Sequence, residues 1–293
     1  MLRYDVVDVF TDRPFAGNQL AVVHGTDGLS DEQLLALAKE FHYSETTFPS
    51  RAHNGGYSVR IFTPGGEIPF AGHPTLGTAW VLRDQGVVTE GSVVQTCGAG
   101  EITVSFDDGL VSLRADPGDL VPCPRAIADE VLVDLGLGGA ALSSAYFAGT
   151  GLTFLHLQVE ESSVRAARPA FRPLESYPLE PLRLRDPLGG IDVYAVSGLE
   201  EHRVDVHVRM FSPGLSVPED AATGSSAAGL GLALVAARVL PRGGYYRISQ
   251  GAEIGRPSTL HGSVTATDGV ATSVNVAGAV QPIASGQIAV PPA

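Results

Sequence analysis

Cysteine and lysine are both rare in this chain. Its two cysteines, Cys97 and Cys123, form no CxxC pair, which excludes a disulfide ladder and favours a reducing compartment. Its single lysine is Lys39, so any Schiff-base chemistry through lysine would have to use that residue. Lys39 lies in a predicted helix between Ala38 and Glu40, where nothing marks a cofactor pocket.

Basic runs and long apolar runs are also missing. The net charge is −13, which argues against a nucleic-acid or anionic-membrane partner. The longest apolar stretch, Ala227 to Val239, is too short and too rich in small residues to cross a bilayer. The first ten residues alternate apolar and polar side chains, which predicts a strand and not a signal peptide. We therefore expect a soluble, cytoplasmic protein.

The composition is that of a well-filled globular protein. Hydrophobic residues make up 44% and charged residues 17% of the 293 residues, and the length favours two domains. Short strand-like segments with Gly and Asp turns follow one another in two series, on either side of a proline-rich joint at residues 117–124. Strands at this frequency predict mostly antiparallel sheet.

Four segments predict helices between these strands. Ser30 and Gln33 form a capping box that opens a helix to about His42, and residues 128–135 predict a shorter equivalent in the second half. Residues 74–83 begin with proline at the first helical position and end near a glycine. Residues 225–239 are apolar on every side, so that helix is buried all round. In a sheet-rich chain this predicts a sheet wrapped around a central helix.

The chain also repeats itself. Val59-Arg-Ile-Phe-Thr-Pro-Gly65 matches Val208-Arg-Met-Phe-Ser-Pro-Gly214, about 150 residues further on. A small-residue turn and then a central helix follow each copy, at Ala71-Gly-His-Pro74 and at Ala222-Thr-Gly-Ser225. A repeat of this length indicates a fused duplication. In such a duplication we expect the functional site in the cleft between the two halves.

The two turns are the strongest functional signal. A helix N-terminus presents backbone N–H groups and the positive end of the helix dipole, and small residues let an anion approach them closely. If the duplication brings both helix starts to one cleft, their amides converge on a spot that suits a carboxylate. The alternative is that each is an ordinary tight turn leading into a buried helix.

Titratable residues stand beside these turns. His73 lies in the first turn, Asp220 precedes the second and Ser225 ends it, although each of these residue types is often only a cap or a satisfied polar group. Glu45 lies between a helix end and an apolar strand, near Phe41 and Phe48. Poor solvation there would raise its pKa towards the range useful for general acid–base catalysis.

Four segments together resemble the signature segments of the phenazine-biosynthesis PhzF family. They are Phe15-Ala-Gly-Asn-Gln-Leu-Ala-Val22, Ser44-Glu-Thr-Thr-Phe48, Phe70-Ala-Gly-His-Pro-Thr-Leu-Gly77 and Glu219-Asp-Ala-Ala-Thr-Gly-Ser225. They occur in the family's order and spacing, and the resemblance runs from about residue 3 to about residue 290. Two prolines usual in the family are replaced, by Gln19 and by Ala221, which affects loop rigidity more than chemistry.

The resemblance implies an α+β fold like that of diaminopimelate epimerase, with two pseudo-symmetric halves, each a curved, mostly antiparallel sheet wrapped around a central helix. We expect residues 1–118, with a C-terminal strand at about 279–293, to form one half and residues 125–278 the other. The active site would lie in the cleft between them. Homodimerisation, common in the family, is also expected.

The resemblance also implies roles for individual residues. Glu45 corresponds to the family's proton-shuttling glutamate, and His73 and Asp220 to its other catalytic positions. The backbone of Gly72–His73 and of Gly224–Ser225 would hold the substrate carboxylate, and Asn18 would contribute to substrate binding. In epimerases and racemases of this fold a cysteine pair exchanges the proton, but we place Ala71 and Ala222 at those positions. A single base that returns the proton to another atom remains, which is an isomerisation.

The function expected is therefore a PhzF-like isomerase without metal or organic cofactor. Its substrate would be a small unsaturated or cyclic carboxylic acid, such as the family's trans-2,3-dihydro-3-hydroxyanthranilate. Two alternatives stay open: a metabolite-binding protein without catalysis, and an isomerase or epimerase of an unrelated amino-acid-like acid. A nicotinamide site is set aside because no glycine-rich loop has the strand–GxGxxG–helix context. A Ser225–His73–Asp220 hydrolase triad is set aside because the GxSxG elbow is missing.

Overall fold

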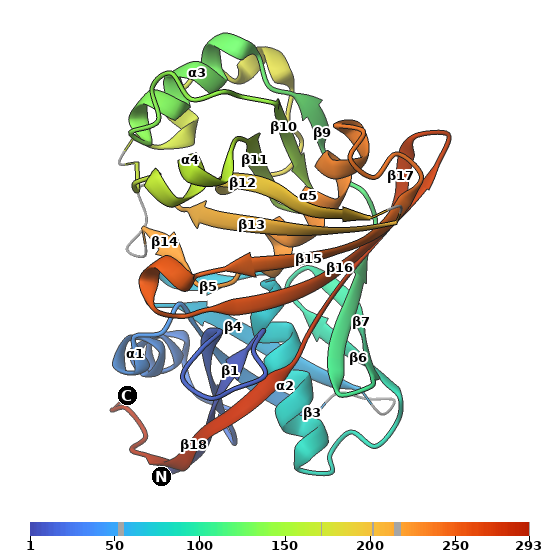
Figure 1. Cartoon of the computed structure of the whole chain (residues 1–293). Coiled ribbons are helices and arrows are strands. Elements are labelled where there is room, and N and C mark those ends of the chain that lie inside the picture. Colours follow the sequence, from blue (N-terminus) through green and yellow to red (C-terminus); the bar gives the residue numbers. More distant parts are fainter. Residues whose placement is uncertain (52–55, 171, 201, 214–217, 293) are drawn as a thin grey trace. The chain divides into compact units, whose positions relative to one another are not determined.

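The computed structural model describes residues 1–51, 56–170, 172–200, 202–213 and 218–292. The chain divides into two compact units, each of which is described by itself. Unit 1 comprises Met1–Leu113 and Ala277–Ala293, and unit 2 comprises Arg114–Val276. The elements of both are labelled in Figure 1.

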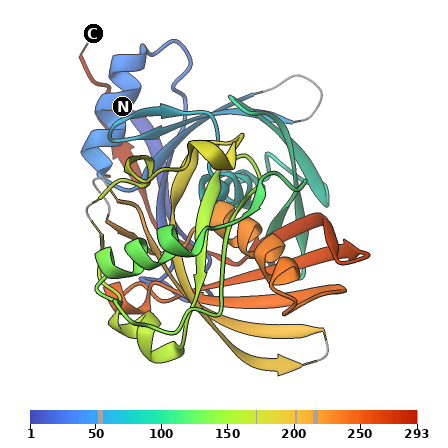
Figure 2. The ribbon, with the colours of Figure 1, turned by 90° about the horizontal axis from the view of Figure 1, so that it is seen from above.

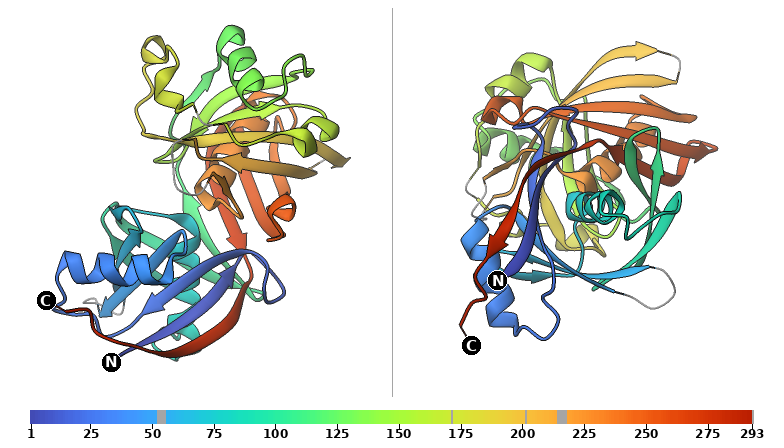
Figure 3. Two further views of the ribbon diagram at one scale, coloured as in Figure 1. Left: turned by 90° about the vertical axis from the view of Figure 1, so that its left-hand side faces the viewer. Right: turned by 90° about the horizontal axis from the view of Figure 1, so that it is seen from below.

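Unit 1 is built on a mixed sheet. Its strands are β1 (Leu2–Val9), β2 (Asn18–Val23), β3 (Glu45–Arg51), β4 (Tyr57–Thr63), β5 (Gly66–Ile68), β6 (Ser92–Cys97), β7 (Gly100–Asp107), β8 (Leu110–Ala115) and β18 (Val280–Ile288). β1 pairs antiparallel with β2, β2 parallel with β3, β3 antiparallel with β4, β4 parallel with β6, and β6 antiparallel with β7. The C-terminal β18 (red) runs antiparallel beside β1 (dark blue), as both views of Figure 3 show.

Unit 2 repeats this order of strands. They are β9 (Leu120–Pro122), β10 (Ser144–Gly149), β11 (Thr153–Gln158), β12 (Leu188–Glu200), β13 (Arg203–Phe211), β14 (Glu219–Asp220), β15 (Gly243–Gln250), β16 (Ser258–Thr267) and β17 (Val270–Gly278). β10 to β16 show the same sequence of antiparallel and parallel pairs as β1 to β7. β9 pairs with β10 as β18 pairs with β1. The duplication predicted from the sequence is therefore visible in the strand pairing.

The larger helices are α1 (Asp31–Phe41), α2 (Gly72–Asp84), α3 (Arg125–Asp134), α4 (Glu161–Ala166) and α5 (Gly224–Ala236), with short 3₁₀ turns η1 (Leu174–Ser176), η2 (Glu180–Leu182) and η3 (Ala252–Ile254). The capping box of Ser30 and Gln33 at the start of α1 is confirmed. The predicted equivalence of residues 128–135 with α1 is wrong. α1 lies between the parallel pair β2 and β3, and the helix between the matching pair β11 and β12 is α4.

α2 and α5 are the central helices of their units, as predicted. α2 contacts β1, β2, β3, β6, β7 and β18, and α5 contacts β10, β11, β15 and β16, so each sheet wraps around its helix. Figure 2 shows both helices (cyan and orange) from above. Leu76 in α2 and Leu230 in α5 are fully buried, and burying a leucine stabilises the fold by about 2 kcal/mol.

Matching glycines allow this close packing of helix on sheet. A Cβ at Gly77 of α2 would lie 2.6 Å from Cδ2 of Leu20, and one at Gly229 of α5 would lie 2.6 Å from the carbonyl oxygen of Ala148. Both glycines stand five positions after the first helical residue of their helix. Together with the mixed sheets, the two wrapped helices confirm the predicted α+β fold class.

Candidate active site

Glu45 is the first residue of β3, and its side chain is half-buried, with the Oε2 atom out of contact with solvent. α1 ends in front of it at His42, whose φ of 55° is left-handed, and two residues then lead into the strand. The Glu45 side chain is 16% exposed. Burial raises its pKa from 4.5 to about 7, and a hydrogen bond with Ser44 opposes part of that rise. A carboxyl group with a pKa near neutrality can both accept and return a proton.

His73 faces this carboxyl group from the start of α2. It is the second residue of the helix and is 5% exposed. Its Nε2 atom lies 3.3 Å from Oε2 of Glu45. Two residues that are far apart in sequence thus meet because α2 packs against β3 inside unit 1.

Asn18, the first residue of β2, joins the same cluster. Its Nδ2 atom lies 3.4 Å from Nδ1 of His73, and the hydroxyl of Ser44 donates to its Oδ1 at 3.2 Å. The parallel register pairs Leu20 of β2 with Glu45 of β3, which brings the start of β2 beside the start of β3. Sequence reasoning named Asn18 and Glu45, but it missed that Ser44 links them.

The start of α2 is suited to an anion. Its N-cap, Ala71, has extended backbone with φ −151° and ψ 144°, and its methyl side chain makes no capping hydrogen bond. Gly72 and His73 are the first two helical residues and are buried. Their N–H groups lie in the helix's first turn, where the dipole is positive.

In unit 2, Asp220 is fixed beside the start of α5. The hydroxyl of Thr223, the N-cap of α5, donates to Oδ2 of Asp220 at 2.6 Å. Nε2 of Gln250 donates to the carbonyl oxygen of Asp220 at 3.0 Å and to Oγ1 of Thr223 at 3.1 Å. Gly224 and Ser225 then open the helix, the glycine buried and the serine half-buried.

Two features here differ from what the sequence indicated. The N-cap of α5 that matches Ala71 of α2 is Thr223, so the placement of Ala222 at that position is wrong by one residue. Neither cap is a cysteine, so the expectation that no cysteine pair exchanges the proton is unchanged. Gln250 was missed altogether. It is 3% exposed at the end of β15, and a polar residue at a buried strand position was the signal that could have found it.

Glu219, next to Asp220, has a structural role as one partner of a buried ion pair. Nε and Nη2 of Arg209 donate to its two carboxylate oxygens at 2.8 and 2.7 Å, and Nη1 donates to the carbonyl oxygen of Ala167 after α4. The Arg209 and Glu219 side chains are 8% and 5% exposed. This buried pair joins β13, β14 and the end of α4, and so fixes the segment that carries Asp220.

A second buried polar cluster lies under the start of α5. Nδ1 of His156 in β11 is 2.8 Å from Oδ2 of Asp192 in β12, and the hydroxyl of Ser226 donates to the same oxygen. All three side chains are at most 2% exposed. The cluster ties the third residue of α5 to the sheet, and sequence reasoning did not identify it.

The predicted site residues thus fall into two groups. Unit 1 brings Glu45, His73, Asn18 and Gly72 together, and unit 2 holds Asp220 beside Gly224 and Ser225. Outside both groups, the two ring nitrogens of His207 lie 2.9 and 3.0 Å from carboxylate oxygens of Glu161 and Glu253. Among the described residues, no group of three or more His, Cys, Asp or Glu side chains is arranged to hold a metal ion.

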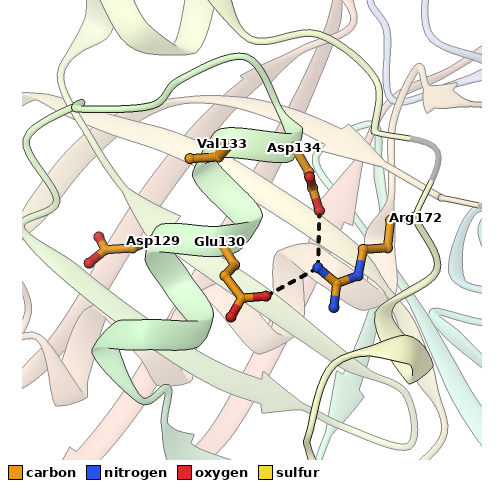
Figure 4. A pocket seen from close by; sticks show the side chains of 5 residues that line it. All are labelled: Asp129, Glu130, Val133, Asp134 and Arg172. Atoms are coloured by element: carbon orange, nitrogen blue, oxygen red, sulfur yellow. Dashed lines mark hydrogen bonds and ion pairs between the residues drawn. The ribbon is translucent and has the colours of Figure 1, made fainter.

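One surface cavity lies away from both groups. It has a volume of about 290 Å³ and is lined by Asp129, Glu130, Val133, Asp134 and Arg172. Figure 4 shows Arg172 placed between two of the acids, at 3.1 Å from Glu130 and 3.7 Å from Asp134. The arginine thus pairs with two of the three acids that line the cavity. None of the described helices is long and apolar enough to span a membrane.

Comparison with known proteins relates the whole chain to one family. Residues 7–286 match the family model described as phenazine biosynthesis-like protein. A trans-2,3-dihydro-3-hydroxyanthranilate isomerase of Pseudomonas aeruginosa is 33% identical over 282 residues, which cover 95% of this chain and 96% of that protein. An uncharacterised isomerase of Mesorhizobium japonicum is 32% identical over 98% of both chains.

Solved structures agree on the fold. A Bacillus anthracis protein of the PhzF family superposes with a TM-score of 0.82 at 21% identity, covering 98% of this chain and 99% of that one. A predicted epimerase from Pseudomonas aeruginosa gives 0.79 at 26% identity, with the same coverage. A probable proline racemase from Agrobacterium radiobacter gives 0.61 at 13% identity, covering all of this chain and 94% of the other.

Proposed function

The chain is an isomerase of the phenazine biosynthesis-like family, and we propose that Glu45 is the one base that moves the proton in its reaction. Glu45 would remove a proton from a carbon that is acidified by conjugation in a small unsaturated or cyclic carboxylic acid. It would return that proton to another carbon of the same skeleton as the double bonds shift. Bonds and protons balance within one molecule, so the reaction asks for no co-reactant.

The observation that carries the proposal is the buried Glu45 carboxyl group with its pKa of about 7, in contact with His73. Above this pKa the carboxylate is ionised and can accept the proton. The protonated form is stable enough in the buried site to hold the proton until it is returned. An ordinary surface glutamate, with a pKa near 4.5, would be a much weaker base.

We further propose that Gly72–His73 in unit 1 and Gly224–Ser225 in unit 2 are substrate-binding positions, whose backbone N–H groups suit a carboxylate. The start of α2 supports this, because the side chain of its N-cap, Ala71, makes no capping hydrogen bond. Such amides stabilise the negative charge that develops when the proton leaves. Asp220, held by Thr223, would orient an amino or hydroxyl group of the substrate.

The first substrate to test is trans-2,3-dihydro-3-hydroxyanthranilate, because the relative that is 33% identical over nearly the whole chain is named for it. Other small unsaturated or amino-acid-like acids follow if it is not converted. Cytoplasmic location and homodimerisation stay predictions; analytical ultracentrifugation tests the second.

The experiment that tests the function separates catalysis from mere binding. Turnover and ligand affinity are measured for the wild type, for Glu45→Gln and for Glu101→Gln, in which an exposed glutamate of β7 undergoes the same change. An isomerase with Glu45 as its base loses turnover in Glu45→Gln, keeps its affinity for the ligand, and is unaffected in Glu101→Gln. Affinity without turnover in the wild type, for every acid tried, would identify a metabolite-binding protein instead.

A further inference from the structure

Asn18, His73, Glu45 and Ser44 are connected in a way that fixes which nitrogen of His73 carries its proton. The hydroxyl of Ser44 donates to Oδ1 of Asn18 at 3.2 Å, so this oxygen is the acceptor of the amide. The other amide atom, Nδ2, can only donate. It lies 3.4 Å from Nδ1 of His73, and both side chains are 5% exposed.

A ring nitrogen that accepts a hydrogen bond carries no proton, and a neutral imidazole then has its proton on the other nitrogen. For His73 that nitrogen is Nε2, which lies 3.3 Å from Oε2 of Glu45. The distance exceeds that of an ordinary hydrogen bond, as catalytic contacts often do before the substrate binds. The His73 N–H therefore faces the carboxyl group that changes its protonation state.

We propose that Asn18 is a positioning residue that holds His73 as the neutral Nε2–H tautomer, so that His73 donates to Glu45 and does not itself carry the proton between carbons. Doubly protonated His73 would place an N–H of Nδ1 against the N–H groups of the Asn18 amide, which is unfavourable. The transferred proton consequently stays on Glu45 alone.

The first test needs neither a variant of Asn18 nor a substrate. Nitrogen-15 NMR of histidine-labelled wild-type protein is recorded between pH 6 and 8, and the His73 signals are assigned by their loss in His73→Gln. We expect a proton on Nε2 and a bare Nδ1 throughout this range, although Glu45 titrates within it. A proton on Nδ1, or a doubly protonated ring, would overturn the inference.

The second test reverses the tautomer. Asn18→Asp replaces the amide donor by a carboxylate, which accepts from Nδ1–H and leaves Nε2 bare towards Glu45. We expect the NMR signature to reverse and kcat to fall on the order of 10²-fold, with KM little changed. Asn275→Asp in β17, half-buried in unit 2, adds the same charge and should alter neither.

If Asn18 instead bound the substrate directly, Asn18→Asp would raise KM and leave the tautomer of His73 unchanged. The kinetic arm rests on the proposed function, because it needs a substrate that is turned over. The tautomer arm does not. Failure to find any substrate would therefore count against the function alone, and a wrong tautomer against this inference alone.

Discussion

Gly190 stands in unit 2 at the position that Glu45 occupies in unit 1. Phe62 and Phe211 match in the sequence repeat, and they pair with Thr46 and Ile191 respectively. The residues preceding these partners are Glu45 and Gly190. A Cβ at Gly190 would lie 2.5 Å from the carbonyl oxygen of Phe211, so the packing of unit 2 excludes any side chain there. Of these two equivalent positions, only the one in unit 1 carries a carboxyl group.

A single base predicts the stereochemistry of the reaction. If Glu45 both removes and returns the proton, the two events take place on the same face of the substrate. When the reaction is run in heavy water, deuterium at the newly protonated carbon should therefore lie on the face from which the original proton left. NMR coupling constants of the product establish this. Deuterium on the opposite face would require a second acid and would contradict the account.

The pH dependence of turnover follows from the raised pKa of Glu45. As the base, Glu45 must be ionised in the free enzyme, and its pKa is about 7 because the carboxyl group is buried. We expect kcat/KM to rise about tenfold per pH unit below pH 7 and to level off above it. A rate profile measured between pH 5 and 9 checks this, and an acidic limb centred near 4.5 would show that the acting carboxyl group is a solvated one.

The same pKa predicts a stability change in Glu45→Gln. Between pH 4.5 and 7 the unfolded chain has lost the proton of this carboxyl group while the folded chain retains it, so the free energy of unfolding falls as pH rises. A pKa raised from 4.5 to about 7 corresponds to about 3 kcal/mol at most. Glutamine has no proton to lose, so Glu45→Gln should gain stability relative to the wild type as pH rises through this range.

Urea unfolding at pH 4 and pH 8 measures the effect, with Glu101→Gln as the control. The difference between wild type and Glu45→Gln should be more favourable to the variant at pH 8 than at pH 4. An equal difference at both pH values would mean that folding does not raise the pKa of Glu45.

The duplicated arginine–glutamate pairs predict unequal stability effects. Arg209 and Glu219 are buried, whereas the matching Arg60 and Glu67 form the same two-pronged contact, at 2.8 and 2.6 Å, with side chains 39% and 43% exposed. Lysine cannot make the two-pronged contact. We expect Arg209→Lys to lower the free energy of unfolding by about 2–3 kcal/mol, and Arg60→Lys by less than about 1 kcal/mol. Thermal unfolding tests both, and equal losses would show that burial does not matter here.

Local sequence signals predicted much of this fold. The apolar residues on every side of residues 225–239 predicted a central helix, and its start was placed one residue from the observed Gly224. Ser30 and Gln33 defined the start of α1 because a cap depends only on neighbours. The pairing of α1 with residues 128–135 failed because helix equivalence depends on which strands a helix connects, and α4 is too short to show a periodic pattern.

The candidate site was predictable in part. Aromatic neighbours indicated a poorly solvated Glu45, and the rise of its pKa through burial is confirmed. The contact between Asn18 and His73 could not be predicted, because it joins residues that only the packing of α2 against the sheet brings together. The same holds for Gln250, which reaches Asp220 and Thr223 across unit 2.

The most direct test of the central claim is proton NMR of trans-2,3-dihydro-3-hydroxyanthranilate in heavy water with wild type and Glu45→Gln. The account predicts that the wild type shifts the double bonds and places solvent deuterium on the new carbon in those turnovers in which the proton on Glu45 exchanges with solvent before it is returned. Glu45→Gln should be slower by at least about 10²-fold. Rearrangement by Glu45→Gln at the wild-type rate would contradict the claim that Glu45 carries the proton.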